Sequence, residues 1–431
     1  MQERRIVGSI AGFMPSAGLS SQPSYATSEK NPFRVAAVTI ASKSRLALAR
    51  VTARSFLEHN PGIPFYVLLA DEVEGCFDPA LEPFHLIGMD QLGLRELVRL
   101  RFQYTEMELS FALTPCVIEY LLNSGFDGVI FLKQETLVLD GLEPVVEKLR
   151  EHSVLLTPHL LGPGEGDDAR EWEINVLRSG MYNGGFIGFS RREDSIGFLS
   201  WWKEKTAWNC FWAVETGIHY EQRWLDFVPA FVPGFHIIRD PGMNVGHWNL
   251  LQRRVGVQAD GQVTANGSSC RVFRFSGYDP DRPGESSRYH SNLTLDQAGD
   301  ASVVFERYRS LLMKEGYEET RRWPYTYEHF DNGVRVPVLA RRIYHDLENP
   351  LERFGDPFCT EPAGSFYRWL NAGADGEGSI PNFWRGVHRR RPDLIAAFGD
   401  LRGEQCTRYE DWIRTSGIQE CGSLQLPGLR G

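Results

Sequence analysis

The stretch Phe131-Leu132-Lys133-Gln134-Glu135-Thr136-Leu137-Val138-Leu139-Asp140 decides the fold of this chain. With the residues before it, the stretch reads as a buried strand over Gly128–Leu132, a short polar turn and a second apolar run. A continuous apolar strand is typical of a sheet that is covered on both faces. The charged residues Lys133 and Glu135 therefore stand directly at the end of a central strand.

The segment upstream predicts the neighbouring strands. Val35–Ile40 and Phe65–Ala70 are apolar runs, and Leu46–His59 between them has the apolar spacing of a helix. A strand-helix-strand unit predicts a parallel sheet with right-handed crossovers, in which ligands bind beyond the carboxyl ends of the strands. Ser42 and Asp71 occupy those ends, and we expect both to be exposed.

The chain divides into three parts by composition. Residues 1–32 are rich in Ser, Gly and Pro and are expected to form a mobile leader. Residues 33–284 predict one α/β domain with a mostly parallel central sheet flanked by helices. Residues 285–431 predict a helical extension with a two-copy repeat, because Phe354-Gly355-Asp356 recurs 44 residues later as Phe398-Gly399-Asp400. Further strands are expected at 154–157, 186–189, 235–238 and 272–275, and a helix at 106–122.

Composition excludes several classes of protein. The formal net charge of −10 argues against nucleic acid as the main partner, since phosphate binding needs a basic face. The seven cysteines are scattered without a Cys-x-x-Cys pair, which favours reduced thiols in a cytoplasmic protein. No apolar run is long enough to span a membrane, although peripheral membrane association stays open. Motifs for NAD, P-loop nucleotides and metalloproteases are missing from the sequence.

Four short segments within residues 34–280 carry a family resemblance. They are 38–42 with 67–72, 131–142, 182–189 with 221–226, and 239–245 with 273–278. In this order they resemble bacterial glycosyltransferases of the GT-A type, distantly similar to family 8 galactosyl- and glucosyltransferases. The resemblance implies a GT-A-like domain for nucleotide-diphospho-sugars, followed by the helical extension.

The motif that holds a metal ion in that family is altered here. The family carries Asp-x-Asp in the turn after the strand, and a His in a His-x-x-Gly-like segment. The matching positions here are Lys133 and Glu135, and then Arg274 in Arg274-Phe275-Ser276-Gly277. Lys and Arg can neutralise phosphate directly, so we expect an enzyme without a metal cofactor. Weak use of Mn²⁺ or Mg²⁺ through Glu135, or lost activity, are the alternatives.

The resemblance also implies a nucleotide pocket at the ends of the first two strands. Thr39, Ala41 and Ser42 would line it, and Asp71 would lie near the base or ribose. The alternative is structural, with Ser42 capping a helix and Asp71 forming a turn at the strand end.

Further site residues follow from the same resemblance. Arg101 would lie near the phosphates, although a solvated position on a helix face is an equal alternative. Asn183 would contact the sugar or the acceptor, and Glu221 would contact the donor sugar or act as a base toward the acceptor. His247 and Trp248 would bind the acceptor. The nucleotide-sugar site would be completed by Gly184, Gly185, Gln222, Ser276 and Gly277.

The resemblance thus implies a hexosyltransferase-like glycosyltransferase. Its donor would be a UDP- or dTDP-sugar and its acceptor a glycan or another hydroxyl compound, in cell-surface polysaccharide synthesis. The alternative from another class is a non-catalytic protein that binds a carbohydrate or a partner on a degenerate GT-A scaffold.

Overall fold

The structure is a computed structural model, and it describes residues 33–166, 169–289, 294–295, 299–373 and 380–421. The predicted leader at 1–32 lies outside the described residues. Contacts group the chain from Phe33 onward into one unit. Within the described ranges, no helix has the length and apolar character that crossing a membrane requires.

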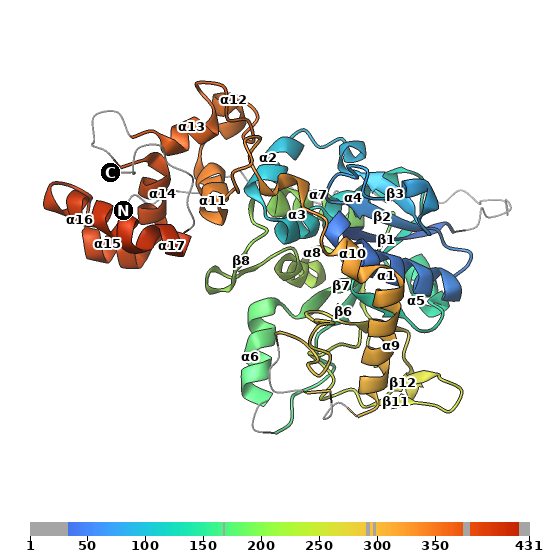
Figure 1. Cartoon of the computed structure of the whole chain (residues 1–431). Coiled ribbons are helices and arrows are strands. Elements are labelled where there is room, and N and C mark those ends of the chain that lie inside the picture. The colour runs from blue at the N-terminus through green and yellow to red at the C-terminus, as the bar shows by residue number, and fades with distance from the viewer. Residues whose placement is uncertain (1–32, 167–168, 290–293, 296–298, 374–379, 422–431) are drawn as a thin grey trace, which may run out of the picture. The chain divides into compact units, whose positions relative to one another are not determined.

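A seven-stranded sheet forms the centre of this unit (Figure 1). Its spatial order is β10-β6-β7-β4-β1-β2-β3, and all neighbours are parallel except that β7 runs antiparallel to both β4 and β6. The mostly parallel sheet predicted from the sequence is therefore confirmed. The strands are β1 (Val35–Ala41), β2 (Phe65–Leu69), β3 (His85–Gly88), β4 (Gly128–Leu132), β6 (Val154–Pro158), β7 (Tyr182–Ser190) and β10 (Phe235–Ile237).

Helices cover both faces of the sheet, which is why its central strands are continuously apolar. In β4, Val129 and Phe131 face one core, and Ile130 and Leu132 face the other. The first core is closed by α4 (Thr114–Asn123) and α7 (Glu193–Trp208), and the second by α1 (Leu46–His59) and α5 (Glu143–Glu151). Burying a large apolar side chain contributes about 1.5–3 kcal/mol relative to exposure. These two layers therefore hold the end of β4 rigidly in place.

The helix expected at 106–122 is divided into α3 (Glu106–Ala112) and α4. Pro115 lies in the first turn of α4. Its ring has no N–H to donate and clashes with the preceding turn, so one uninterrupted helix cannot form. The remaining helices of the α/β part are α2 (Leu97–Gln103), α6 (Ala169–Ser179), α8 (Val228–Phe231), α9 (Ala301–Lys314) and α10 (Tyr317–Thr320).

Short strands outside the main sheet were not predicted, except for β14. Strand β5 (Thr136–Val138) pairs antiparallel with β14 (Val272–Arg274). A three-stranded sheet contains β11 (Val255–Val257), β12 (Val263–Ala265) and β13 (Ser268–Ser269), and β8 (Trp212–Ala213) pairs with β9 (Ile218–His219). Strands of two or three residues are too short to show an alternating pattern.

The sequence repeat falls on two sets of three helices. The first set is α11 (Val338–Asp346), α12 (Pro350–Phe354) and α13 (Phe366–Asn371). The second is α14 (Asn382–Arg390), α15 (Pro392–Phe398) and α16 (Glu404–Trp412), followed by α17 (Ile418–Cys421). Gly355 and Gly399 end α12 and α15 with positive φ angles of 68° and 56°, a conformation that favours glycine.

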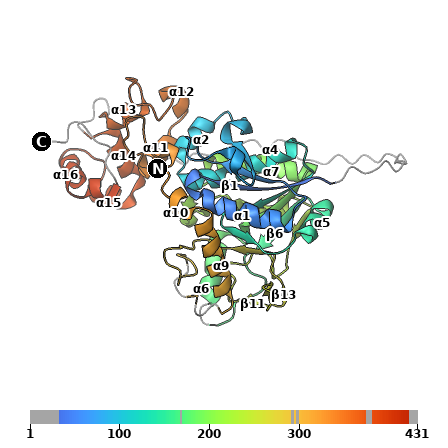
Figure 2. The ribbon, with the colours of Figure 1, turned by 45° about the vertical axis from the view of Figure 1, so that its right-hand side comes forward.

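Helix α9 shares a core with the α/β part of the chain. Phe305 and Tyr308 of α9 lie in one apolar cluster with Phe273 and Phe275 at the end of β14. Figure 2 shows α9 close to α1, and the two helices contact each other. A segment after residue 285, in the predicted helical extension, therefore reaches the region of the candidate site.

Candidate active site

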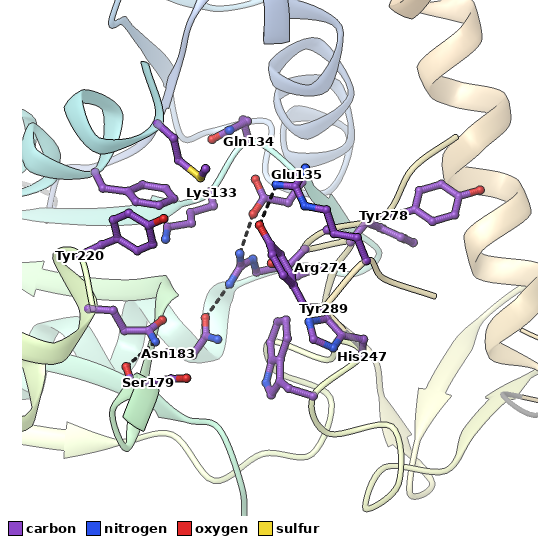
Figure 3. Close-up of a pocket in the computed structure, with 18 of the residues that line it drawn as sticks. Lys133, Gln134, Glu135, Ser179, Asn183, Tyr220, His247, Arg274, Tyr278 and Tyr289 are labelled. Atoms are coloured by element: carbon purple, nitrogen blue, oxygen red, sulfur yellow. Dashed lines mark hydrogen bonds and ion pairs between the residues drawn. The ribbon is translucent and has the colours of Figure 1, made fainter. Parts of the chain in front are cut away.

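A cavity of about 880 Å³ opens beside the turn that follows β4 (Figure 3). Because β7 runs antiparallel to β4, the beginning of β7 lies next to the end of β4, and Leu132 pairs with Phe186. The Lys133 amide donates to the Gly185 carbonyl at 3.0 Å. The sheet topology thus brings the turn at 133–135 together with the segment at 183–185.

The pair β5–β14 adds Arg274 to this turn. In its register Arg274 lies opposite Thr136, directly after the turn, and the Phe275 amide donates to the Glu135 carbonyl at 2.8 Å. The turn and Arg274 are far apart in the sequence, but the backbone hydrogen bonds between β5 and β14 hold them next to each other. The predicted proximity of Lys133, Glu135 and Arg274 is therefore a property of the backbone pairing.

Arg274 is held by two acceptors. One of its terminal nitrogens lies 2.7 Å from Glu135 Oε1, and the other donates to Asn183 Oδ1 at 2.6 Å. The guanidinium passes over the backbone of Gly185, where an added Cβ would lie only 1.7 Å from Arg274 Nη1. Its Cζ also lies 5.2 Å from the ring centroid of Trp248. Gly185 therefore provides the space for Arg274, a role that differs from the predicted contact with the donor.

Asn183 connects Arg274 to a neutral histidine. Its Oδ1 accepts from Arg274 and from the Gly185 amide, so its Nδ2 is the donor to His159 Nε2 at 2.9 Å. His159 Nε2 must then carry a lone pair. Burial, with the nearby His219 and Arg274, lowers the pKa of His159 to about 3, which agrees with this tautomer.

Lys133 forms the second ion pair of the site. Its ammonium lies 2.8 Å from Glu221 Oε1 and 3.7 Å from the ring centroid of Phe111. The Glu221 side chain is fully buried, and no hydrogen bond to its carboxylate oxygens is found among the described residues. Lys133 is thus the main compensation for a buried negative charge.

The two ion pairs together are electrically neutral. Burial raises the pKa of Glu135, but the charges of Arg274 and Lys133 outweigh this effect and leave the pKa below its ordinary value. Glu135 is therefore ionised at neutral pH. An anionic ligand must compete with Glu135 and Glu221 for the two cations, or find others. Four further arginines line the same cavity: Arg45, Arg178, Arg288 and Arg321.

The site does not suit a divalent cation. The part of the chain that the structure describes contains no group of three Asp, Glu, His or Cys side chains that could hold a metal ion. Arg274 lies against Glu135, the carboxylate expected to serve as a ligand in the alternative prediction. A protonated guanidinium cannot coordinate a hard metal ion, so these residues do not fit Mn²⁺ or Mg²⁺.

The predicted nucleotide pocket at the ends of β1 and β2 is closed. Thr39, Ala41, Ser42 and Asp71 are all buried and do not line the cavity. The prediction that Ser42 and Asp71 are exposed is therefore wrong. Residues from far along the chain cover this place, because the Thr326 amide donates to Asp71 Oδ1 at 3.1 Å.

Both predicted strand-end residues have partners within the protein. The Ser42 hydroxyl contacts Glu106 and lies 3.0 Å from the Ser44 hydroxyl. Ser42 occupies the N-cap position of the short 3-10 helix Lys43–Arg45, but its side chain makes no capping hydrogen bond. Asp71 Oδ1 lies 3.5 Å from the buried Lys43 ammonium and accepts from the next amide in the chain at 2.9 Å, as its alternative turn role predicts. Burial raises the pKa of Asp71, although the contacts to Thr326 oppose this.

Arg101 also lies outside the cavity lining. It is bonded to Glu72 at 3.0 Å and Asp90 at 3.1 Å, with its Cζ 5.1 Å from the ring centroid of Tyr327. The ring of Tyr327 and the two carboxylates account for its position, so a role near phosphates finds no support in this placement.

The other predicted residues lie in or directly behind the cavity wall. Gln222 accepts from the Gly184 amide and donates to the Ser179 carbonyl, so it holds the beginning of β7 in place. Gly277 has a φ of 74°, and an added Cβ would lie 2.5 Å from Ser287 Oγ. The cavity lining contains the predicted residues Lys133, Gln222, Glu135, Asn183, Glu221, His247, Trp248, Arg274, Ser276 and Gly277.

Several residues of the cavity wall were not predicted. They include His159, Trp172, Tyr220 and Tyr308. His159 directly follows β6. Its position at the end of a predicted strand could have identified it as a site residue. Trp172 and Tyr308 lie on the helices α6 and α9, where an aromatic side chain is more often part of the core, so no sequence signal distinguished them.

Comparisons with known proteins found relatives of low identity. No family model matches the chain. It is 26% identical to the uncharacterized protein YfnF of Bacillus subtilis (strain 168) over 284 residues, covering 64% of this chain and 90% of that protein. It is 22% identical to the uncharacterized protein YfnD of the same organism, covering 56% of this chain and 76% of that protein.

Glycosyltransferases are among the solved structures that the chain resembles. One is galactosyltransferase LgtC in complex with donor and acceptor sugar analogues, with 16% identity and a TM-score of 0.40, covering 65% of this chain and 95% of that one. Another is glycosyltransferase GlyE of Streptococcus pneumoniae TIGR4, with 14% identity and a TM-score of 0.39, covering 69% of this chain and 66% of that one. About a third of this chain is therefore unmatched in each comparison.

Proposed function

We propose that the protein is a hexosyltransferase-like glycosyltransferase that works without a metal ion. It would transfer a sugar from a nucleotide-diphospho-sugar, such as a UDP- or dTDP-sugar, to a glycan or another hydroxyl acceptor. Its place would be the synthesis of cell-surface polysaccharide in the cytoplasm. The observation that carries the proposal is the pair of buried cations, Lys133 and Arg274, at one wall of a cavity large enough for such a donor.

The proposed reaction uses these cations to stabilise the leaving group. The bond between the anomeric carbon and the diphosphate oxygen breaks, and a bond from the acceptor oxygen to that carbon forms. Lys133 and Arg274 donate charge-assisted hydrogen bonds to the departing diphosphate as its negative charge grows. Glu221 accepts the proton of the acceptor hydroxyl. Asn183 and Gly185 position Arg274, as the contacts above support.

The experiment is turnover in the presence of EDTA. The protein is incubated with UDP- and dTDP-sugars and a panel of glycan acceptors, and release of the nucleoside diphosphate is measured. We expect release in EDTA, with little change when Mn²⁺ is added. Loss of release in EDTA that Mn²⁺ restores would contradict metal independence, and no release under any condition would contradict the enzyme itself.

The second candidate function is binding of a carbohydrate without catalysis. It is favoured by the neutrality of the two ion pairs and by the aromatic side chains Trp172, Trp212, Tyr220 and Trp248 in the cavity wall, since aromatic faces suit sugar rings. Calorimetry that detects glycan binding, together with no nucleotide release from any donor, would support this candidate.

A further inference from the structure

Helix α9 places a tyrosine in the cavity wall. Tyr308 stacks on Phe275 with a centroid distance of 3.7 Å and an interplanar angle of 1°. Phe275 directly follows Arg274, and its amide donates to the Glu135 carbonyl. Tyr308 is thus tied through one ring contact to the segment that carries the central ion pair.

The hydroxyl of Tyr308 is buried without a partner. The residue is only 1% exposed, and its hydroxyl oxygen has no hydrogen bond to any described residue. Some other buried tyrosines find acceptors: the Tyr104 hydroxyl donates to the Thr206 carbonyl at 2.6 Å, and Tyr409 to the Trp384 carbonyl at 2.8 Å. Tyr344 shares the condition of Tyr308 but does not line the cavity. A buried polar group without a partner destabilises the fold, so each case calls for an explanation.

A second tyrosine of the same wall, Tyr278, also has a buried hydroxyl without a hydrogen bond to the described part of the chain. Tyr278 lies on the side of the cavity next to α9 in Figure 3, with its ring centroid 6.3 Å from that of Tyr308. Its hydroxyl oxygen is buried and also lacks a hydrogen bond among the described residues. Both tyrosines line one cavity, and the Tyr278 ring points toward α9 in Figure 3. The unpartnered Tyr308 hydroxyl, next to the segment that carries Arg274, therefore points to an acceptor supplied by a ligand.

The protonation state of Tyr308 suits a donor. Burial raises the pKa of its hydroxyl well above the ordinary value, with a further rise from Glu135 and an opposing effect of Arg274. The hydroxyl therefore keeps its proton at any physiological pH, and these two groups are close enough to act on it.

The charge distribution along the cavity indicates which part of the ligand lies here. The lining near α1 and α9 includes Arg45 and Arg321 as well as Tyr308. The Arg45 side chain is 39% exposed, with Glu106 at 3.6 Å, so it has donors to spare. Arg321 is paired with Asp281 at 2.7 Å, so Arg45 supplies the available cationic donors. A guanidinium with hydroxyl donors in the same wall suits phosphate oxygens.

The opposite lining has a different character. It includes Trp172 on α6, Trp212 on β8, and Tyr220 directly after β9. Flat aromatic faces suit the apolar faces of a saccharide better than a diphosphate, and Glu171 and Arg178 of α6 line this side as well. The two ends of the cavity thus separate a place for phosphate from a place for sugar, with Lys133 and Arg274 lining it as well.

We propose that the Tyr308 hydroxyl binds the diphosphate of the nucleotide donor, and that α9 is thereby part of the active site. This inference rests on the proposed function, because it assigns one end of the same cavity. It places a binding residue after position 285, where the sequence predicted only a helical extension.

The test compares Tyr308→Phe with Tyr344→Phe. Each variant removes one buried hydroxyl without a hydrogen bond among the described residues, but Tyr344 lies in the core of the C-terminal helices and does not line the cavity. Calorimetry in EDTA would measure the affinity for UDP, dTDP and inorganic pyrophosphate. Since a hydrogen bond to a charged group is lost, Tyr308→Phe should bind UDP or dTDP, and pyrophosphate, roughly 10- to 100-fold more weakly. Tyr344→Phe should bind all of them as the wild type does.

Thermal unfolding without ligand completes the test. Both variants should keep or raise the unfolding temperature, because neither loses a hydrogen bond within the protein. A clear fall for Tyr308→Phe would show that its hydroxyl has a structural partner and would overturn the inference. Unchanged nucleotide affinity, or unchanged pyrophosphate affinity alone, would overturn it while the proposed function stands. Wild-type protein that binds no nucleotide in any condition would overturn both.

Discussion

The ion pair between Lys133 and Glu221 should contribute strongly to stability. Glu221 is fully buried, and the Lys133 ammonium at 2.8 Å is its main compensation. Removing one member of a buried pair typically costs about 3–5 kcal/mol, since the other charge stays buried and unpaired. Lys133→Met keeps most of the side-chain volume against Phe111. For a cooperative unit of this size, we expect it to lower the unfolding temperature by roughly 4–6 °C.

A double-mutant cycle separates the pair from its surroundings. Glu221→Gln removes the opposite charge, and the double variant should recover part of the loss caused by Lys133→Met, because no uncompensated charge is left. The matched control is Lys148→Met, which breaks a pair with Glu151 at 2.9 Å whose side chains are 44% and 59% exposed. Exposed pairs on a helix surface, three or four residues apart, contribute only about 0.2–0.5 kcal/mol.

The assay is thermal and urea unfolding followed by circular dichroism, with the four proteins of the cycle and the control measured side by side. If Lys133→Met costs no more than Lys148→Met, or if the double variant is as unstable as the sum of the single ones, the ion pair carries no coupling energy. The reasoning about a buried, singly compensated Glu221 would then be refuted. In turnover, Glu221→Gln should be inactive yet bind nucleoside diphosphate at least as tightly, because Lys133 no longer has a competing carboxylate.

Two further predictions concern the contacts of Arg274 and Asn183. Gly185→Ala should displace Arg274, whose Nη1 would lie 1.7 Å from the new Cβ, and slow nucleotide release roughly 10- to 100-fold. The helical Gly197→Ala, with open space at its Cβ, should keep full activity. His159 has a folded pKa of about 3, below the unfolded value of about 6.5, so the stability it contributes above pH 6.5 is lost as pH falls toward 3. Urea unfolding at pH 7.5 and 5.0 should show a decrease about 2 kcal/mol larger in the wild type than in His159→Gln; equal decreases would contradict a neutral, buried His159.

The main sheet was predictable because its strands are long and doubly buried. Runs such as Val35–Ala41 and Gly128–Leu132 alternate between two apolar cores, so nearly every residue is apolar, with Thr39 as the polar exception. The strands of two or three residues, by contrast, owe their pairing to neighbours that the local sequence does not show. Strand β14 was found because its apolar residues Val272 and Phe273 lie in a core.

The sequence indicated many of the residues that belong to the candidate site, but not which of them form ion pairs with one another. Lys133, Glu135 and Arg274 were singled out by their positions, yet nothing local indicated that Glu221 would neutralise Lys133. The burial of Asp71 was missed for the same reason, because it depends on a residue far away in the sequence. Its cover comes from Thr326, 255 residues further along the chain, and such long-range contacts depend on the whole fold.

In the proposed function, the two ion pairs would keep cations ready for a phosphate in a buried site. A lone buried lysine or arginine is costly to keep charged, and Glu221 and Glu135 reduce that cost in the protein without a ligand. In the proposed reaction the diphosphate takes over Lys133, and the negative charge of Glu221 then becomes available to the acceptor hydroxyl. Binding of the donor would thus prepare the base for the acceptor, which a tightly held metal ion in place of Lys133 would not do.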